Sequence, residues 1–113
     1  MLSKETLLAY GANYDEGMAR CLNREAFYFK MIKMVAANEK FASLGKALIA
    51  KDLKAAFEDA HALKGIAANV SLTPLSNAIE AIVEPLRRRE DIDYTEMYTR
   101  IVELKKKLDE IIA

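Results

Sequence analysis

The chain has 113 residues, of which 52% are hydrophobic and 30% charged, and its 17 basic residues balance 17 acidic residues. This length and apolar content suffice for one domain with a buried core, without disulfides or metals as staples. Zero net charge argues against a basic nucleic-acid-binding protein and against a disordered acidic tail. We therefore expect a single globular domain over residues 1–113.

Cys21 is the only cysteine, so no disulfide can form within the chain. Free cysteines are usually buried and inert, and a lack of disulfides is typical of proteins in reducing compartments. The N-terminal apolar run is short and interrupted by charge, unlike a secretory signal, and no stretch approaches the ~18 uncharged apolar residues of a membrane span. We expect a cytoplasmic protein without a membrane segment.

The first half of the chain predicts helices separated by short breaks. Residues 3–20, punctuated by glycines and Asn13, predict one or two short helices that pack across one end of the fold. Residues 24–52 predict helix almost throughout, with a break or kink at Asn38 because asparagine favours helix caps. Two apolar stripes are expected to be buried in this segment: Phe27, Met31 and Met34, and then Phe41, Leu44 and Leu48.

A long helix is predicted from Leu53 to about Val70, with Asp52 as its N-cap. Its expected core stripe consists of Leu53, Ala56, Phe57, Ala60, Leu63 and Ala67. His61, the only histidine of the chain, lies just outside this stripe. We expect its imidazole to be mostly in water.

Two further helices follow. Thr73 is expected as an N-cap before Pro74 at the first helical position, and Pro85 is expected to kink or end that helix before the run of three arginines. Asp93 is expected to cap the last helix, with Glu96 completing a capping box. The apolar stripes are Leu75, Ile79, Ile82 and Leu86 in the first helix, and Tyr94, Met97, Ile101, Leu104, Leu108 and Ile111 in the second. Since no strand pattern competes, the sequence predicts an all-α, up-and-down four-helix bundle with short additional N-terminal helices.

His61 has three neighbours on the helix surface with unusual properties. Lys64, Gly65 and Ala68 follow it at i+3, i+4 and i+7, so one neighbour carries a cation and two carry almost no side chain. A glycine inside a helix is less favourable than alanine by about 0.5–1 kcal/mol. We interpret Gly65 as leaving room for a bulky body that approaches the histidine.

These residues suit phosphoryl transfer. An exposed imidazole is largely neutral near pH 7 and is a competent covalent nucleophile. Because the transferred group carries its charge on oxygens, catalysis depends on positioning and electrostatics. We therefore predict His61 as the phosphoryl acceptor and Lys64 as the residue that stabilises the phosphoryl oxygens.

The segment "HALKGIAANVSL", residues 61–72, resembles the signature of the histidine-containing phosphotransfer (HPt) domains of bacterial multistep phosphorelays. That signature is His-x-Leu-Lys-Gly, then small residues, an asparagine, an aliphatic residue and often a second glycine. Ser71 stands where the second glycine is usual, a mild departure because serine tolerates turn geometry. Residues 11–32 also resemble the N-terminal segment of the family. The matching positions are Gly17, Arg20, Phe27 and Tyr28 in that segment, and His61, Leu63, Lys64, Gly65, Ala68, Asn69 and Val70 in the signature.

The resemblance implies a phosphorelay carrier without turnover of its own. His61 would accept a phosphoryl group from the phospho-aspartate of one response-regulator receiver domain and pass it to another, downstream of a hybrid sensor histidine kinase. Gly65 and Ala68 would belong to the surface on which the receiver docks. The receiver would supply a Mg²⁺ ion, so this chain is expected to need no cofactor, and we expect a monomer. The alternative is an HPt-like adaptor that binds receivers without carrying phosphate.

Other readings of the same residues are less favoured. One histidine and one cysteine, far apart in the sequence, fall short of the three or four protein ligands of a zinc site. The basic runs in residues 85–91 and 103–110 are expected to be solvated helix ends rather than a nucleic-acid surface. Four methionines at helical spacing are expected to fill the core: Met18, Met31, Met34 and Met97.

Overall fold

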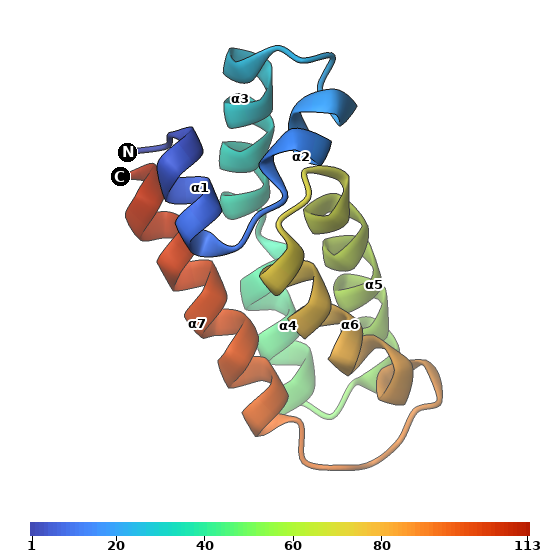
Figure 1. The fold of residues 1–113 in the computed structure, drawn as a ribbon. Coiled ribbons are helices and arrows are strands. Elements are labelled where there is room, and N and C mark those ends of the chain that lie inside the picture. Colours follow the sequence, from blue (N-terminus) through green and yellow to red (C-terminus); the bar gives the residue numbers. More distant parts are fainter.

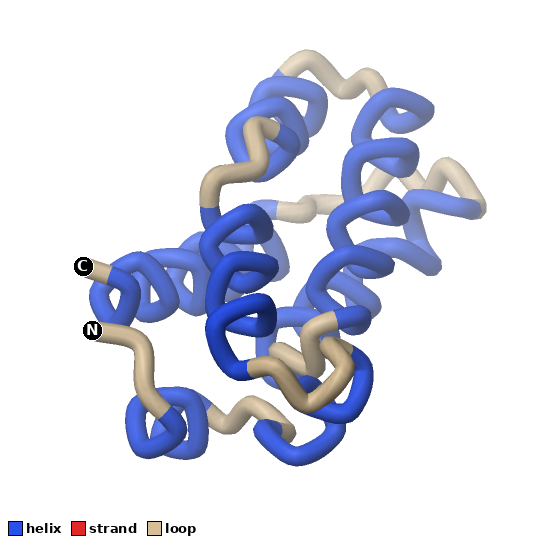
Figure 2. Tube along the Cα trace, turned by 90° about the horizontal axis from the view of Figure 1, so that it is seen from above, coloured by secondary structure: helices blue, strands red, loops and turns tan.

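A computed structural model describes all 113 residues and contains seven helices and no strand, which confirms the all-α prediction (Figures 1 and 2). None of the helices is both long enough and apolar enough to cross a membrane. The helices are α1 (Lys4–Tyr10), α2 (Tyr14–Arg20), α3 (Glu25–Ala36), α4 (Lys40–Ile49), α5 (Leu53–Asn69), α6 (Thr73–Arg87) and α7 (Thr95–Ile112).

Helices α4 to α7 form the up-and-down bundle. α5 and α6 are an antiparallel pair joined by a short turn, α4 packs on α5, and α7 packs on α6 (Figure 1). α3 stands above α4 (Figure 1). At the same end of the bundle, α1 lies next to the two chain termini, and α2 lies on the other side of α3, close to the end of α5 (Figure 1). The structure therefore confirms the four-helix bundle with short additional N-terminal helices.

The predicted stripes of α5, α6 and α7 form most of the core. Along each helix the apolar residues recur at three- and four-residue spacing, so they share the face that packs on the neighbouring helices. Leu53 and Phe57 of α5 are only partly buried. Fully or almost fully buried are Ala56, Ala60, Leu63 and Ala67 in α5, Leu75, Ile79, Ile82 and Leu86 in α6, and Ile101, Leu104 and Leu108 in α7.

The predicted stripe of α3 was wrong. Phe27 and Met34 are 39% and 56% exposed, and the buried face instead carries Tyr28, Ile32 and Val35. Both sets have helical spacing, so periodicity could not choose between them. Tertiary packing decides the matter, because the Tyr28 hydroxyl donates a hydrogen bond of 2.8 Å to the Val70 carbonyl at the end of α5.

The predicted filling of the core by methionines holds for three of the four. Met34 is an exposed residue of α3, so the prediction for it was wrong for the same reason as the stripe. The other three pack against the core while remaining partly exposed: Met18, Met31 and Met97.

Two predicted helix boundaries in the first half are confirmed, and at each of them a side chain accepts a backbone N–H. Asp52 Oδ1 accepts the Ala55 N–H at 3.1 Å at the start of α5. Asn38 lies in the break between α3 and α4, where its side-chain oxygen accepts the Lys40 N–H at 2.8 Å. Each bond satisfies one of the backbone donors that a helix start leaves unpaired.

The start of α6 differs by one position from the prediction. Thr73 is the first helical residue rather than the N-cap, which is Leu72, and no side chain caps this end. Pro74 nevertheless lies within the first turn, where its missing N–H has no helical partner to lose. The helix passes through Pro85 and ends soon afterwards, at Arg87.

The start of α7 also differs. The N-cap is Tyr94, and Asp93 lies one residue earlier. The Asp93 carboxylate accepts the Thr95 N–H at 2.9 Å, two residues along the chain, which is a local turn that delays the helix. Hydrogen bonds from Thr95 hold the pKa of Asp93 below its ordinary value. The predicted capping box with Glu96 was therefore wrong, since no side chain caps the helix start.

Cys21 is buried, with 4% of its surface exposed, as predicted. Burial raises the pKa of its thiol and so disfavours the reactive thiolate.

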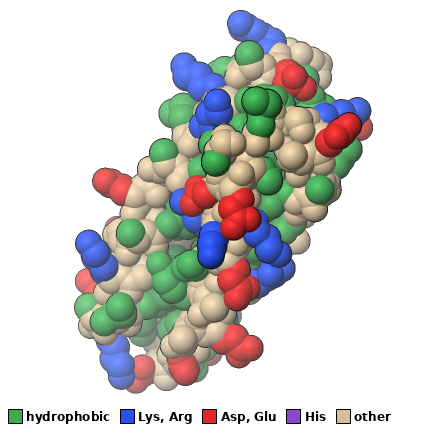
Figure 3. All heavy atoms as spheres, turned by 90° about the vertical axis from the view of Figure 1, so that its left-hand side faces the viewer, with side chains coloured by type: hydrophobic (Ala, Val, Ile, Leu, Met, Phe, Trp, Pro, Cys, Tyr) green, Lys and Arg blue, Asp and Glu red, His purple; other side chains and the backbone are tan.

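The side of the bundle formed by α7 and α1 carries mixed charge. Figure 3 shows acidic and basic side chains interspersed among apolar ones on this side. No strip of uniform positive charge crosses this face.

Candidate functional site

α5 places His61 near the middle of a rigid helix. The buried side of α5 is lined by Leu63 and by three alanines, Ala56, Ala60 and Ala67, whose small side chains let the helix pack close to its neighbours. His61 is exposed, as the hydrophobic pattern predicts. Its imidazole is therefore displayed on a fixed element and is open to a partner molecule.

The imidazole of His61 stacks on the ring of Phe57, one turn earlier in α5. The ring centroids are 5.4 Å apart and the planes make an angle of 16°. Two guanidinium groups from the end of α6 lie over the same phenyl ring, Arg87 at 5.0 Å and Arg89 at 5.2 Å from its centroid. Cations are attracted to the faces of aromatic rings, so Phe57 links the histidine of α5 to two positive charges on α6.

Arg89 is held in place by its own backbone surroundings. Its backbone has a φ of 55°, which marks the left-handed turn that ends α6. Its guanidinium Nη1 donates to the Leu86 carbonyl at 2.8 Å, satisfying one of the acceptors that a helix end leaves free. The prediction that this basic run serves the helix end is thus supported, and two of its arginines additionally cover Phe57.

Lys64, predicted to stabilise the phosphoryl oxygens, forms an ion pair with Glu80 of α6. Its Nζ lies 2.8 Å from Glu80 Oε2, and the two side chains are 35% and 46% exposed. Glu80 Oε2 is itself shielded from solvent and forms no hydrogen bond of acceptable geometry. The contact is therefore an ion pair without a well-aligned hydrogen bond.

Gly65 borders open space. A Cβ placed on Gly65 has no heavy atom within 4 Å, so packing against another helix does not require a glycine at this position. Ala68, one turn further along, is partly exposed. Together they leave a shallow, unobstructed strip of α5 beside His61.

The end of α5 is fastened to the N-terminal helices. Ser71 adopts a φ of 55°, the left-handed conformation for which glycine is usual. Its hydroxyl donates to Glu16 Oε1 of α2 at 2.9 Å, a bond that glycine could not make. Tyr28 of α3 holds the Val70 carbonyl, and the missing side chain of Gly17 leaves space for the Tyr28 ring. Serine in place of the expected glycine thus adds a hydrogen bond that ties the end of α5 to α2.

The structure brings together four residues beside the predicted site that sequence reasoning did not assign to it. Phe57 could have been found from the sequence, because it precedes His61 by four residues on the same helix. Glu80, Arg87 and Arg89 could not, because only the packing of α6 on α5 brings them there.

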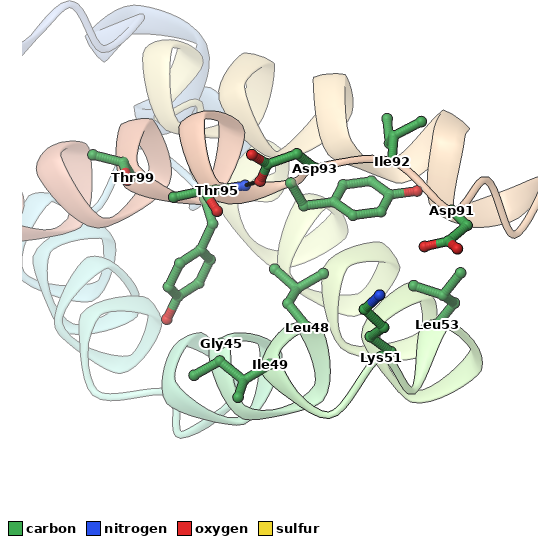
Figure 4. A pocket seen from close by; sticks show the side chains of 12 residues that line it. Gly45, Leu48, Ile49, Lys51, Leu53, Asp91, Ile92, Asp93, Thr95 and Thr99 are labelled. Atoms are coloured by element: carbon green, nitrogen blue, oxygen red, sulfur yellow. Dashed lines mark hydrogen bonds between the residues drawn. The ribbon is translucent and has the colours of Figure 1, made fainter.

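A hollow with a volume of about 580 Å³ lies elsewhere, between the end of α4, the start of α5 and the loop before α7. Lys51 and Asp91 stand on its opposite walls at one end, and Leu48 points into it (Figure 4). The Asp93 carboxylate accepts the Thr95 N–H, and the Tyr98 hydroxyl donates to the Phe41 carbonyl. No group of three or more His, Cys, Asp or Glu side chains is arranged to hold a metal ion.

The candidate site is thus one exposed histidine on a helix of an all-helical bundle, with a lysine one turn further along and an open glycine beside it. Residues 34–113 match the family model of the Hpt domain, more than half of the chain. The chain therefore belongs to the Hpt domain family. No curated protein and no solved structure is a significant match.

Hpt domains are phosphocarrier modules of phosphorelay signalling, where they interact with receiver domains and kinases, and are not enzymes in the usual sense. The matched region contains α4 to α7 and thus His61, Lys64 and Gly65. It begins near the end of α3, so the N-terminal resemblance in residues 11–32 lies outside the match and stays a prediction.

Proposed function

We propose that this chain is a phosphorelay carrier in which His61 accepts a phosphoryl group from the phospho-aspartate of one receiver domain and passes it to another. The observation that carries the proposal is the exposure of the only imidazole in the middle of α5, between a lysine and an open strip of helix. A carrier needs its reactive group outside the fold, because two partners must reach it in turn.

The chemical step is a displacement at phosphorus. The unprotonated ring nitrogen of His61 attacks the phosphorus of the acyl phosphate, an N–P bond forms, and the P–O bond to the aspartate carboxylate breaks. The carboxylate leaves with the bonding electron pair, while the second ring nitrogen keeps its proton. Transfer to the next receiver is the same step reversed, with a new carboxylate as the nucleophile.

The residues around His61 have separate roles in this proposal. Phe57 restrains the imidazole by stacking, and Lys64 places a cation near the phosphoryl oxygens, over which the charge of the transferred group is spread. Gly65 and Ala68 leave the surface open for the receiver. The receiver contributes the acceptor aspartate and a Mg²⁺ ion, so the proposal assigns no metal to this chain and no turnover without a partner.

The alternative is an adaptor that binds receivers without carrying phosphate. Both functions need the open surface at Gly65, but only a carrier needs the imidazole. Phosphorylation of the His61 side chain therefore distinguishes a carrier from an adaptor.

The test is incubation with receiver domains from the same genome that carry radiolabelled phosphate. The chain should acquire an alkali-stable, acid-labile label, and His61→Gln should acquire none while keeping the helical circular dichroism of the wild type. A stable label on the His61→Gln variant would refute the assigned acceptor. Receiver binding without any label on the wild type would instead establish the adaptor.

A further inference from the structure

The resting position of Lys64 is turned towards α6. Its ammonium lies 2.8 Å from Glu80 Oε2, which is shielded from solvent although the Glu80 side chain as a whole is 46% exposed. The ammonium therefore neutralises a carboxylate before any phosphoryl group is present. This partner was not predicted from the sequence.

The packing of α5 on α6 shows where Glu80 lies relative to His61. Lys64 of α5 is opposite Glu80 of α6, and Phe57 of α5 is opposite Arg87 of α6. Since the two helices run antiparallel, His61 lies opposite the segment between Glu80 and Arg87. Lys64 follows His61 by three residues, about one turn of α5, so the pair with Glu80 places the ammonium against the level of α6 that faces Lys64 and not against the level that faces His61.

We propose that Glu80 is a positioning residue that holds the Lys64 ammonium away from His61 until a phosphoryl group on the imidazole competes for it. This inference rests on the proposed function. It assigns to Glu80 the control of how strongly the phosphoryl group is retained on His61, because part of the attraction between the ammonium and the phosphoryl oxygens is offset by the loss of the resting pair.

The contact is suited to such an exchange. It is an ion pair without a well-aligned hydrogen bond, so little directional bonding is lost when it opens. Both side chains are partly exposed, and water can solvate the carboxylate once the ammonium has left. A dianionic phosphoryl group offers more charge and more acceptor oxygens than one carboxylate, so it is the stronger competitor.

The experiment measures the equilibrium between phosphorylated receiver and phosphorylated carrier, starting from the labelled receiver that labels the wild type. Glu80→Gln keeps the shape of the side chain and removes its charge. Exposed ion pairs change an equilibrium by up to about fivefold, so Glu80→Gln should raise the ratio of phospho-His61 to phosphorylated receiver by about two- to fivefold. Circular dichroism and urea unfolding confirm that the variant is folded.

Two further variants test whether Glu80 acts through Lys64. In the Lys64→Ala background, Glu80→Gln should leave the ratio unchanged, because there is no ammonium to release. Asp109→Asn is the matched control: it removes one carboxylate and an ion pair of similar length, 2.7 Å to Lys105, on α7, and it should leave the ratio at the wild-type value.

An unchanged or lowered ratio in Glu80→Gln overturns the inference, and so does an equal rise in the Lys64→Ala background, which would show direct repulsion by the carboxylate. A wild type that takes up no label at all marks the failure of the proposed function, with which the inference falls. Labelled wild type with an unresponsive Glu80→Gln variant marks the failure of the inference alone.

Discussion

Replacing Gly65 by alanine tests whether this glycine leaves room for a docking partner or lets α5 pack against another helix. Gly65 lies inside α5 and has an ordinary helical backbone, since Gly11 is the only glycine with a positive φ. An added Cβ meets no heavy atom within 4 Å. Nothing in the fold therefore opposes the substitution, and alanine restricts the unfolded chain more than glycine does.

The expected effect is a gain of about 0.4–1 kcal/mol in the free energy of unfolding. With a urea m-value of about 1–3 kcal/mol/M, this moves the unfolding midpoint upward by about 0.5 M. Urea titration followed by circular dichroism at 222 nm is sufficient to measure it. A midpoint below that of the wild type would refute the reasoning, because it would mean that the glycine serves the packing of the bundle.

Two other glycines provide the opposite control. A Cβ on Gly17 would overlap the hydroxyl of Tyr28, and one on Gly45 would lie 2.5 Å from the hydroxyl of Tyr98. Alanine at either position has to displace a tyrosine ring from its packed place, which typically destabilises by about 1–3 kcal/mol. The sign of the glycine-to-alanine effect thus distinguishes Gly65 from both of them.

A larger residue at Gly65 tests access itself. Gly65→Gln should remain folded, with unchanged helical circular dichroism, because its side chain extends into solvent. If a receiver docks on this strip, the variant should lose affinity for it and transfer phosphate slowly, although His61 and Lys64 are intact. Wild-type affinity in Gly65→Gln would show that the docking surface lies elsewhere on the bundle.

Two further predictions concern Lys64 and Tyr28. Lys64→Ala should slow phosphoryl transfer at saturating receiver, because it removes an interaction worth about 1–3 kcal/mol. The free energy of unfolding in urea should change by less than about 1 kcal/mol, because the ion pair with Glu80 is partly exposed. Equal transfer rates in the variant and the wild type would mean that the lysine has no part in the chemistry. Burial raises the pKa of Tyr28 from 10.0 to about 12, so the neutral phenol is favoured in the folded state. The corresponding stability is present below pH 10 and is lost as the pH rises towards 12, by about 2 kcal/mol for this group. Tyr28→Phe should therefore lose less stability than the wild type between pH 9 and about 11.5, as measured by urea unfolding, and an identical loss in both proteins would contradict the role of burial.

Local sequence determines most of the bundle. The stripes of α5, α6 and α7 follow from spacing alone, because an amphipathic helix has one face that it can bury. Asp52 and Asn38 mark helix boundaries through bonds to backbone groups only two or three residues away. The exposure of His61 follows in the same way, from its position beside the stripe of its own helix.

Boundaries and faces that depend on competing local options were decided by the fold. In α3, two apolar stripes satisfy the helical period, and the buried one is the one whose tyrosine reaches both Gly17 and the Val70 carbonyl. At the start of α7, the Asp93 side chain could cap the helix or accept the Thr95 N–H, and in the structure it accepts the Thr95 N–H. Such choices differ by small local energies, which tertiary contacts easily outweigh.

The sequence alone therefore determined that this protein is an all-helical bundle that displays one histidine with a lysine one turn away. It also carried the short signature by which the family resemblance was made. Only the tertiary structure decided which residues from α6 and the turn after it lie near that histidine: Glu80 beside Lys64, and Arg87 and Arg89 over Phe57. These residues are 16 or more positions away along the chain and reach the site only through the antiparallel packing of α6 on α5, since the relative level of two packed helices depends on how their side chains interlock and not on the period of either helix.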